Sequence, residues 1–330
     1  MQVSILGAGG FLGRKLAARL AADGTLAGQR LSGLTLFDLV APPVPPAHFP
    51  VTTLTGDIAA LPEQAIPDGT TVVFDLAAVV SAQAEADYDL GRRVNLGGTH
   101  AVIDACRRLP GAGKHPPRVV FTSSVASFSG SQASVLCDDA RQIPASSYGA
   151  QKAAAELILA DASRRRYLDA VSLRLPTIIV RPGRPNRAAS SFLSSVIREP
   201  LLGLEAELPV AEDFAAWVAS PRRAVDWLLH AAAIDTAAMG LDRSVNPPGI
   251  CTTITQLLQA LERVRPGATA LVRRTDDPAI AGIVNTWPPA FQPVRARTLG
   301  FAPHEPLEEV IRAFVEDDLA ATRRDRGLED

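Results

Sequence analysis

The spacing of one tyrosine and one lysine is the clearest sign of chemistry in this sequence. Tyr148 and Lys152 are four residues apart, so on a helix they share one face. An ammonium beside a phenol favours the phenolate, which predicts that the tyrosine pKa falls from about 10 towards neutral pH. Such a phenolate can accept the proton of an alcohol during its oxidation. Taken alone, the spacing also fits an amphipathic helix with a solvated lysine.

A serine at the end of a predicted strand is the second candidate. Val119–Phe121 is an apolar run, and the hydroxyl residues that follow it end with Ser124. Open α/β sheets bind their ligands at the carboxyl ends of the strands. Ser124 precedes Tyr148 by 24 residues, enough for the chain to leave this cleft and return. Its hydroxyl could hold the reacting oxygen of a substrate, although a lone serine here is also a common turn or cap.

Three regularly spaced glycines predict a phosphate-binding loop near the N-terminus. Gly7, Gly10 and Gly13 form G-x-x-G-x-x-G directly after an apolar run, Val3–Leu6, and before a helical pattern. Glycines permit the tight turn and the close approach of backbone to a pyrophosphate, and the helix N-terminus supplies free N–H groups. The position between strand and helix separates this motif from an ordinary glycine-rich turn. It predicts a bound dinucleotide.

An acidic residue after the second predicted strand bears on the choice of dinucleotide. Asp38 follows Leu34–Phe37 and lies 25 residues beyond Gly13. A carboxylate there can accept both hydroxyls of the adenosine ribose and would repel a 2′-phosphate, which favours NAD over NADP. A turn cap before Pro42 is the alternative. Arg14 favours NADP instead, because a cation beside the loop could bind a 2′-phosphate.

Two further segments fit the same site. Asp57 and Ile58 follow a third strand, Val51–Leu54, where the carboxylate could take the adenine amino group or merely form a turn. A fourth strand, Val72–Leu76, runs into small residues that let a dinucleotide lie flat on the sheet edge. The segment in question is Leu76, Ala77 and Ala78.

These sites need a frame of alternating strands and helices. Strand patterns, with Val171–Leu175 as a further one, alternate with helical patterns such as Thr99–Leu109 and Ala150–Arg165. This order predicts a Rossmann-type, doubly wound parallel α/β sheet. After Pro176 the sequence no longer shows this regular alternation of strand and helix patterns. We expect an NAD-binding domain over residues 1–176 with a returning segment at about 213–245, and a smaller substrate lobe over 177–212 and 246–330.

Composition excludes several classes of function. The 330-residue chain has a net charge of −2, so it offers no electrostatic case for nucleic acid or an anionic membrane. It has no apolar stretch of about 20 residues and no signal-peptide pattern. Three widely spaced cysteines without metal-ligand spacing predict a reducing compartment, no disulfide and no metal. We expect a cytoplasmic protein.

Taken together, these motifs resemble the extended short-chain dehydrogenase/reductases of the NAD-dependent epimerase/dehydratase type. The resemblance implies that Tyr148 accepts the proton, Ser124 orients the reacting oxygen and Lys152 holds the nicotinamide ribose. It also implies a homodimer through the helices Thr99–Leu109 and Ala150–Arg165. The implied NAD-binding residues are Gly7, Gly10, Phe11, Leu12, Gly13, Asp38, Asp57, Ile58, Leu76, Ala77, Ala78, Asn95, Tyr148, Lys152 and Pro176.

Departures from the motifs of the wider family narrow the range of reactions that this chain could catalyse. Val125 and Ala126 follow Ser124 where sugar-nucleotide dehydratases carry Thr-Asp-Glu, so the acid and base for water elimination are missing. Guanidiniums near the reacting carbon suit a small carboxylate better than a bulky diphosphate; solvated or acid-paired arginines are the alternative. The expected substrate-binding residues are Ser124, Tyr148, Thr177, Arg181, Arg184 and Asn186.

The segments 172–200 and 217–221 are similar to one branch of this family, which oxidises C2 of D-erythronate, a four-carbon sugar acid, to 2-oxo-tetronate with NAD. Two alternatives stay open at this point. One is a nucleotide-sugar 4-epimerase, which would keep NAD bound and return the hydride. The other is a non-catalytic dinucleotide-binding protein, since a fold alone does not determine function.

Overall fold

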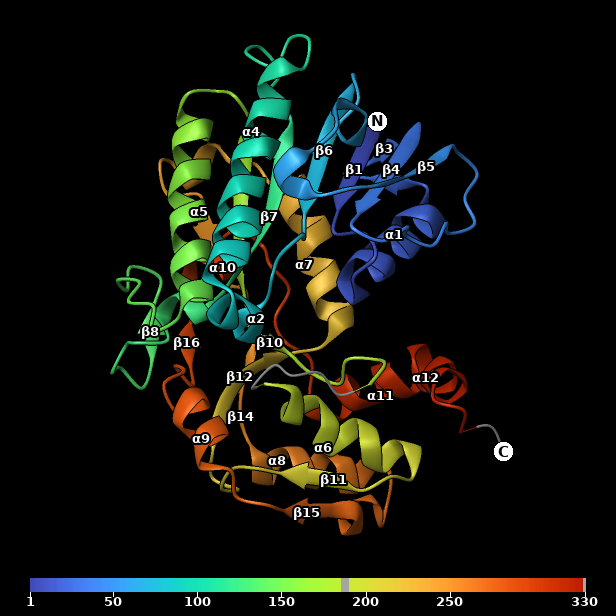
Figure 1. Ribbon diagram of the computed structural model, residues 1–330, viewed down its shortest axis with the longest axis vertical. Coiled ribbons are helices and arrows are strands. Elements are labelled where there is room, and N and C mark those ends of the chain that lie inside the picture. The colour runs from blue at the N-terminus through green and yellow to red at the C-terminus, as the bar shows by residue number, and fades with distance from the viewer. Residues whose placement is uncertain (185–189, 329–330) are drawn as a thin grey trace.

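A seven-stranded sheet forms the centre of the molecule (Figure 1). The computed structural model describes residues 1–184 and 190–328. The sheet order is β13-β9-β7-β6-β1-β4-β5, and every neighbouring pair is parallel. In chain order the strands are β1 (Gln2–Leu6), β4 (Gly33–Asp38), β5 (Val51–Thr55), β6 (Thr70–Asp75), β7 (Arg118–Ser124), β9 (Asp169–Leu175) and β13 (Ser244–Val245). The predicted fold class is confirmed.

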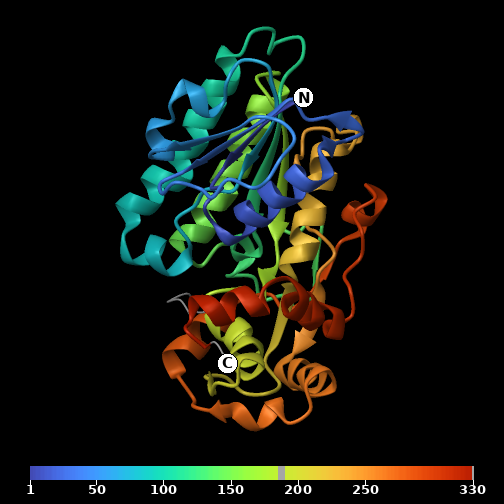
Figure 2. The same ribbon diagram turned by 90° about the vertical axis from the view of Figure 1, so that its right-hand side faces the viewer.

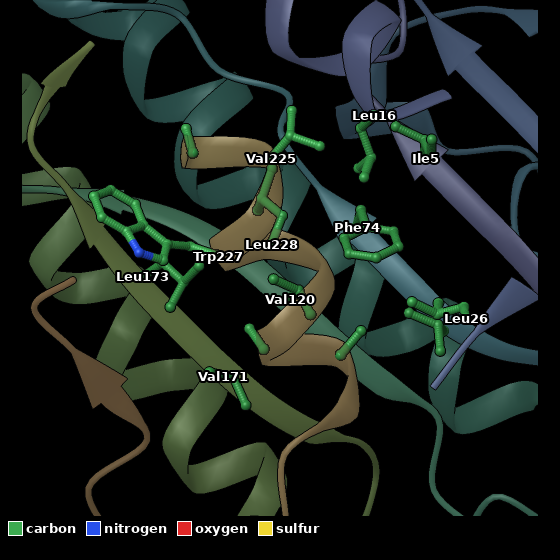
Figure 3. Close-up of a cluster of buried hydrophobic side chains, with 14 of the residues drawn as sticks. Ile5, Leu16, Leu26, Phe74, Val120, Val171, Leu173, Val225, Trp227 and Leu228 are labelled. Carbon is green, nitrogen blue, oxygen red and sulfur yellow. The ribbon is translucent and has the colours of Figure 1, made fainter. Parts of the chain in front are cut away.

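Helices cover both faces of this sheet, as parallel strands require. On one face lie α1 (Phe11–Asp23) and α7 (Pro221–Ala233); on the other lie α4 (Gly98–Arg108) and α5 (Ser147–Arg164) (Figure 2). Figure 3 shows how strand and helix side chains interdigitate on the first face. Among them Trp227 of α7 is fully buried, and its indole N–H donates to the carbonyl of Ala302 at 3.0 Å.

The strand order creates a switch point beside β1. After β1 the chain builds β4 and β5 on one side, then crosses to β6, β7 and β9 on the other. Loops that leave β1 and β6 therefore diverge and open a crevice at the carboxyl ends of the strands, where doubly wound folds bind ligands. The glycine loop and the serine after β7 both lie at this edge.

A second hydrophobic core lies below the carboxyl ends of the sheet (Figure 1). It is built by the helices α6 (Ser191–Leu202), α8 (Ile254–Val264) and α11 (Leu307–Asp317). A small sheet of β10 (Thr177–Ile178), β12 (Ala215–Ala219) and β14 (Ile250–Thr253), and the pair β11 (Ala206–Leu208) and β15 (Val272–Arg274), accompany them.

The remaining elements are short. They are β2 (Thr25–Leu26), β3 (Gln29–Arg30), β8 (Leu136–Cys137) and β16 (Phe291–Gln292), with the helices α2 (Ser81–Ala86), α3 (Tyr88–Gly91), α9 (Pro278–Val284), α10 (Val294–Thr298) and α12 (Leu319–Asp325). Single helical turns span Ile58–Ala60, Glu63–Ala65, Val125–Phe128, Ala237–Met239 and Ala268–Leu271, and Arg92–Gly97 is π-helical.

The boundaries of two helices are not set by the spacing of apolar residues alone. Helix α7 begins at Pro221, because Ser220 caps it by accepting from the N–H of Arg223 at 3.0 Å and proline suits the first turn. The segment after Pro306 forms two helices, α11 and α12, which meet at Asp318.

Within residues 1–184 and 190–328, no helix has the length and apolar character needed to cross a membrane. The same residues contain no cluster of three or more His, Cys, Asp or Glu side chains suited to a metal ion. All three cysteines are unpaired; Cys106 is buried, whereas Cys137 and Cys251 are exposed.

Candidate active site

The glycine loop leaves no room for side chains where it meets the sheet. Gly7 has φ +84°, and a Cβ on it would lie 2.7 Å from the backbone nitrogen of Ala77. A Cβ on Gly13 would lie 2.7 Å from the Cα of Ala8. Gly10 caps α1 without a side-chain hydrogen bond. The first turn of α1 can therefore receive the phosphates of a dinucleotide.

Asp38 lies against this loop. Its two carboxylate oxygens accept from the N–H groups of Gly9 and Leu39, both at 2.7 Å. Each carboxylate oxygen keeps a second lone pair, so the two oxygens can still accept hydrogen bonds from ribose hydroxyls. Arg14 donates from Nε to the carbonyl of Gly9 at 2.6 Å, so the loop backbone already engages this guanidinium.

Asp38→Asn should change the choice of dinucleotide. The substitution keeps the side-chain shape and one acceptor oxygen but removes the negative charge that would repel a 2′-phosphate. We expect the ratio of kcat/KM for NAD to that for NADP to fall at least about tenfold. Initial rates at 340 nm with each cofactor measure it. An unchanged ratio would mean that Asp38 serves only the loop.

Asp57 and Ile58 have structural contacts of their own. Asp57 accepts from the N–H of Ala59 at 3.0 Å and forms an ion pair with Arg93. Ile58 is 6% exposed, and its side chain lies 2.8 Å from where a Cβ on Gly98 would be. Both residues sit beyond β5, beside the first turns of the α4 region, where a role towards adenine stays a prediction.

Asn95 holds the loop after β6. It lies in the π-helical stretch and is 3% exposed. Its Oδ1 accepts from the N–H of Val79 at 2.9 Å, and its Nδ2 donates to the Val79 carbonyl at 3.0 Å and to Gln151 at 2.7 Å. Gln151 precedes Lys152 on α5. Asn95 thereby ties the strand-end loop to the helix that carries the candidate base.

The start of α5 brings Tyr148 to Ser124. Ser146 caps the helix by accepting from the N–H of Gly149 at 3.2 Å. A Cβ on Gly149 would lie 2.9 Å from the carbonyl carbon of Ala126, so only glycine lets the helix pack this close to the segment after β7. Ser124 and Tyr148 line the same cavity, and Ser124 lies close enough to lower the Tyr148 pKa. The two hydroxyls can therefore bind one oxygen of a substrate.

The expected lowering of the Tyr148 pKa is wrong for this structure. Tyr148 keeps some exposure to the cleft, yet burial of its hydroxyl raises the pKa to about 12, opposed only by the nearby Ser124 side chain. The Lys152 ammonium lies 5.8 Å from the Tyr148 ring centroid and 4.4 Å from that of Phe121. Burial lowers the Lys152 pKa to about 8, so this cation is itself weakened.

Asp75, which the sequence did not single out, stabilises the Lys152 ammonium. Asp75 ends β6 and is 2% exposed. Burial raises its pKa to about 6, while Lys152 and the N–H of Ala77 pull it down. In turn, Asp75 and then Glu156 raise the Lys152 pKa against the effect of burial.

Oxidation should become faster as pH rises from 6 to 10, because the phenolate is the active base and the Tyr148 pKa lies above neutrality. In Asp75→Asn the Lys152 pKa should fall below about 8, since one of two nearby carboxylates is lost. Less ammonium then supports the phenolate, so the rising limb should move to higher pH. Profiles of kcat/KM against pH test this; coinciding profiles for the two proteins would contradict it.

A buried ionic cluster lies next to the face of α5 that carries the candidate catalytic residues. Tyr148, Lys152 and Glu156 follow one another at four-residue spacing, a signal that could have identified Glu156. Its carboxylate accepts from Arg174 at 2.8 Å and from three further side chains. These donors are Ser123, Gln142 and Ser244.

One cavity of about 450 Å³ joins these groups at the carboxyl edge of the sheet. From the predicted set it is lined by Gly7, Gly10, Phe11, Leu12, Gly13, Leu76, Ala78, Ser124, Tyr148, Lys152, Pro176, Thr177, Arg181 and Arg184. Asp38, Asp57, Ile58, Ala77 and Asn95 do not line it. Asn186 lies outside the described residues. Arg198, Ile283 and Trp287 line the cavity without having been predicted.

A larger, more open hollow of about 750 Å³ covers α3 and the start of α4. Asp87, Arg93 and His100 are among its lining residues, and it contains none of the candidate catalytic groups. Its breadth reflects an open surface between helices, so we place the chemistry in the smaller cavity.

Known proteins resemble this chain over nearly its whole length. The sequence model of the NAD dependent epimerase/dehydratase family matches residues 3–218. D-erythronate dehydrogenase of Cupriavidus necator is 47% identical over 96% of this chain and 98% of its own. The Haemophilus influenzae enzyme of the same name is 36% identical over 97% of this chain and all of its own.

A solved structure agrees in fold but carries a different description. The nucleoside-diphosphate-sugar epimerase from Agrobacterium tumefaciens is 44% identical, with a TM-score of 0.91 over 97% of this chain and 95% of its own. The two relatives named D-erythronate dehydrogenase and the family match make this protein an NAD-dependent dehydrogenase. With its glycine loop, its switch-point crevice and a match over most of its first 218 residues, the chain belongs to the NAD-dependent epimerase/dehydratase family.

Proposed function

We propose that the protein oxidises the C2 hydroxyl of a small sugar acid, D-erythronate in the first place, to 2-oxo-tetronate, while NAD is reduced to NADH. The observation that carries the proposal is a shared cavity. It brings the hydroxyls of Ser124 and Tyr148 together with the guanidinium of Arg181. The proposal is also supported by the two relatives called D-erythronate dehydrogenase.

The chain's own residues bind, orient and move one proton. The glycine loop and Asp38 would hold the dinucleotide, and Lys152 would hold the nicotinamide ribose. NAD, when bound, supplies the acceptor for the hydride from C2. Tyr148 as phenolate takes the proton of the C2 hydroxyl, Ser124 holds that oxygen, and a C=O bond forms as the C–H electron pair leaves. Arg181, Arg184 or Asn186 would hold the carboxylate.

A nucleotide-sugar 4-epimerase is the second candidate, favoured by the description of the Agrobacterium tumefaciens structure. An epimerase returns the hydride to its substrate and keeps the cofactor. A dehydrogenase releases NADH at every turnover, so this release separates the two.

The proposal also covers the division into domains, the pairing of two copies and the cellular compartment. Residues 1–176 with 213–245 would bind NAD, and 177–212 with 246–330 would bind the substrate. Two copies would pair through α4 and α5, where Leu157 is 71% exposed. Unpaired cysteines are typical of the cytoplasm, where we place the protein.

The test is absorbance at 340 nm with NAD or NADP and a panel of C3–C6 aldonates that includes D-erythronate. NADH formed with the four-carbon acid supports the proposal. If no acid yields NADH and the protein isomerises a UDP-sugar, the protein is the epimerase instead.

A further inference from the structure

Two arginines meet at the substrate end of the cavity. Arg181 follows β10, and Arg198 lies on α6; both line the cavity that contains Tyr148. The side chain of Arg198 is 2% exposed. Burial, and then the like charge of Arg198, lower the pKa of Arg181 to about 10. A guanidinium in a partly enclosed cavity, with a like charge beside it, favours the binding of an anion unless an acid of the protein already pairs with it.

The charge of Arg198 already has a partner. Its Nε and one Nη donate to Glu199 at 2.9 and 2.7 Å, and Glu199 also forms an ion pair with Arg326 of α12. The other Nη donates to the backbone carbonyl of Arg181 at 2.8 Å. Arg198 is thus fixed by its own acid and holds the chain at Arg181.

The charge of Arg181 has no such partner. Its Nε contacts the hydroxyl of Ser194 at 3.3 Å. Within residues 1–184 and 190–328, no carboxylate lies within ion-pair distance of its guanidinium. A guanidinium withdrawn from water without a carboxylate is unfavourable unless a ligand supplies one.

The backbone before Arg181 is in a conformation that favours glycine. Val180 has φ +54°, although it is β-branched and fully buried. Such outliers persist only where the surroundings impose them, and they concentrate at functional sites. Here the neighbouring β10–β12 pairing continues in the bond from the N–H of Ile179 to Ala219 at 2.9 Å, and Arg198 fixes the carbonyl of Arg181.

We infer that Arg181 binds the carboxylate of the substrate, and that Arg198 is a positioning residue that holds Arg181 in the cavity. The inference rests on the proposed function and selects one of the three anchors named there. Arg184 is the weaker choice because its side chain is exposed, so water already solvates its charge. A planar guanidinium can bind a carboxylate through two parallel hydrogen bonds.

The test compares D-erythronate with D-erythronamide, its neutral amide, at saturating NAD. Arg181→Gln should lower kcat/KM for the acid about 100-fold, mainly through KM, and change that for the amide less than about threefold. Arg181→Lys should recover part of the preference for the acid. Arg198→Gln should also reduce this preference, with the Kd of NAD unchanged. Arg273→Gln, on the exposed side of β15, is the matched control and should alter neither substrate.

Opposite outcomes overturn the inference. Equal losses on acid and amide in Arg181→Gln would show a structural role alone. If Arg184→Gln loses the preference for the acid over the amide and Arg181→Gln keeps it, Arg184 binds the carboxylate instead of Arg181. If Arg181→Gln instead loses binding of a UDP-sugar, the anion recognised is a diphosphate. Wild-type protein that oxidises no sugar acid would overturn the proposed function as well, whereas normal wild-type oxidation leaves that function standing.

Discussion

Tyr148→Phe should lower kcat by about 10³–10⁴-fold while NAD still binds. Phenylalanine fills the same space but has no hydroxyl, so no group at this position can accept the proton of the C2 hydroxyl. Ser124 remains in the cavity but can only hold the substrate oxygen. Rates at 340 nm measure turnover, and titration calorimetry measures the Kd of NAD.

The matched control is Tyr88→Phe, which removes a hydroxyl from a tyrosine on α3 that is 60% exposed. We expect it to leave kcat and the Kd of NAD unchanged. A Tyr148→Phe protein that keeps a tenth or more of the wild-type kcat would exclude Tyr148 as the base. It would also revive the interpretation of the chain as a dinucleotide-binding protein without catalysis.

Glu156→Gln should lower the free energy of unfolding by about 3–5 kcal/mol, because it leaves the buried guanidinium of Arg174 without a counter-charge. Arg174 and Glu156 have side-chain exposures of 9% and 2%, and their shortest contact is 2.8 Å. Urea unfolding, followed by tryptophan fluorescence, gives the free energy. Glu156 also stands beside Lys152, so the variant should lose activity at temperatures where it remains folded.

Asp161→Asn serves as the control on the same helix. Asp161 is exposed and pairs with Arg164 and Arg165 in solvent, where ion pairs contribute little. The control should unfold at nearly the wild-type urea concentration. If Glu156→Gln unfolds at the same concentration as the control, the buried cluster is not a stability element, and the six hydrogen bonds to Glu156 would have to serve orientation alone.

Features encoded over short stretches could be predicted from the sequence. The parallel sheet follows from apolar runs that alternate with helical patterns, and the glycine loop follows from a motif between one strand and one helix. Helix ends were harder, because capping rather than periodicity sets them. Ser220 with Pro221 sets the start of α7, and the segment after Pro306 forms two helices that meet at Asp318.

By itself the sequence determined which residue types could do chemistry, since the positions of Tyr148 and Lys152 on one helix face require only local geometry. Only the tertiary structure decided how strongly each group ionises. The Tyr148 pKa rises because burial outweighs the opposing effect of Ser124, and Asp75 acts on Lys152 across the sheet from 77 positions away. Contacts such as Arg198 with Arg181 arise where packing joins distant segments, and burial and charge are sums over all those neighbours.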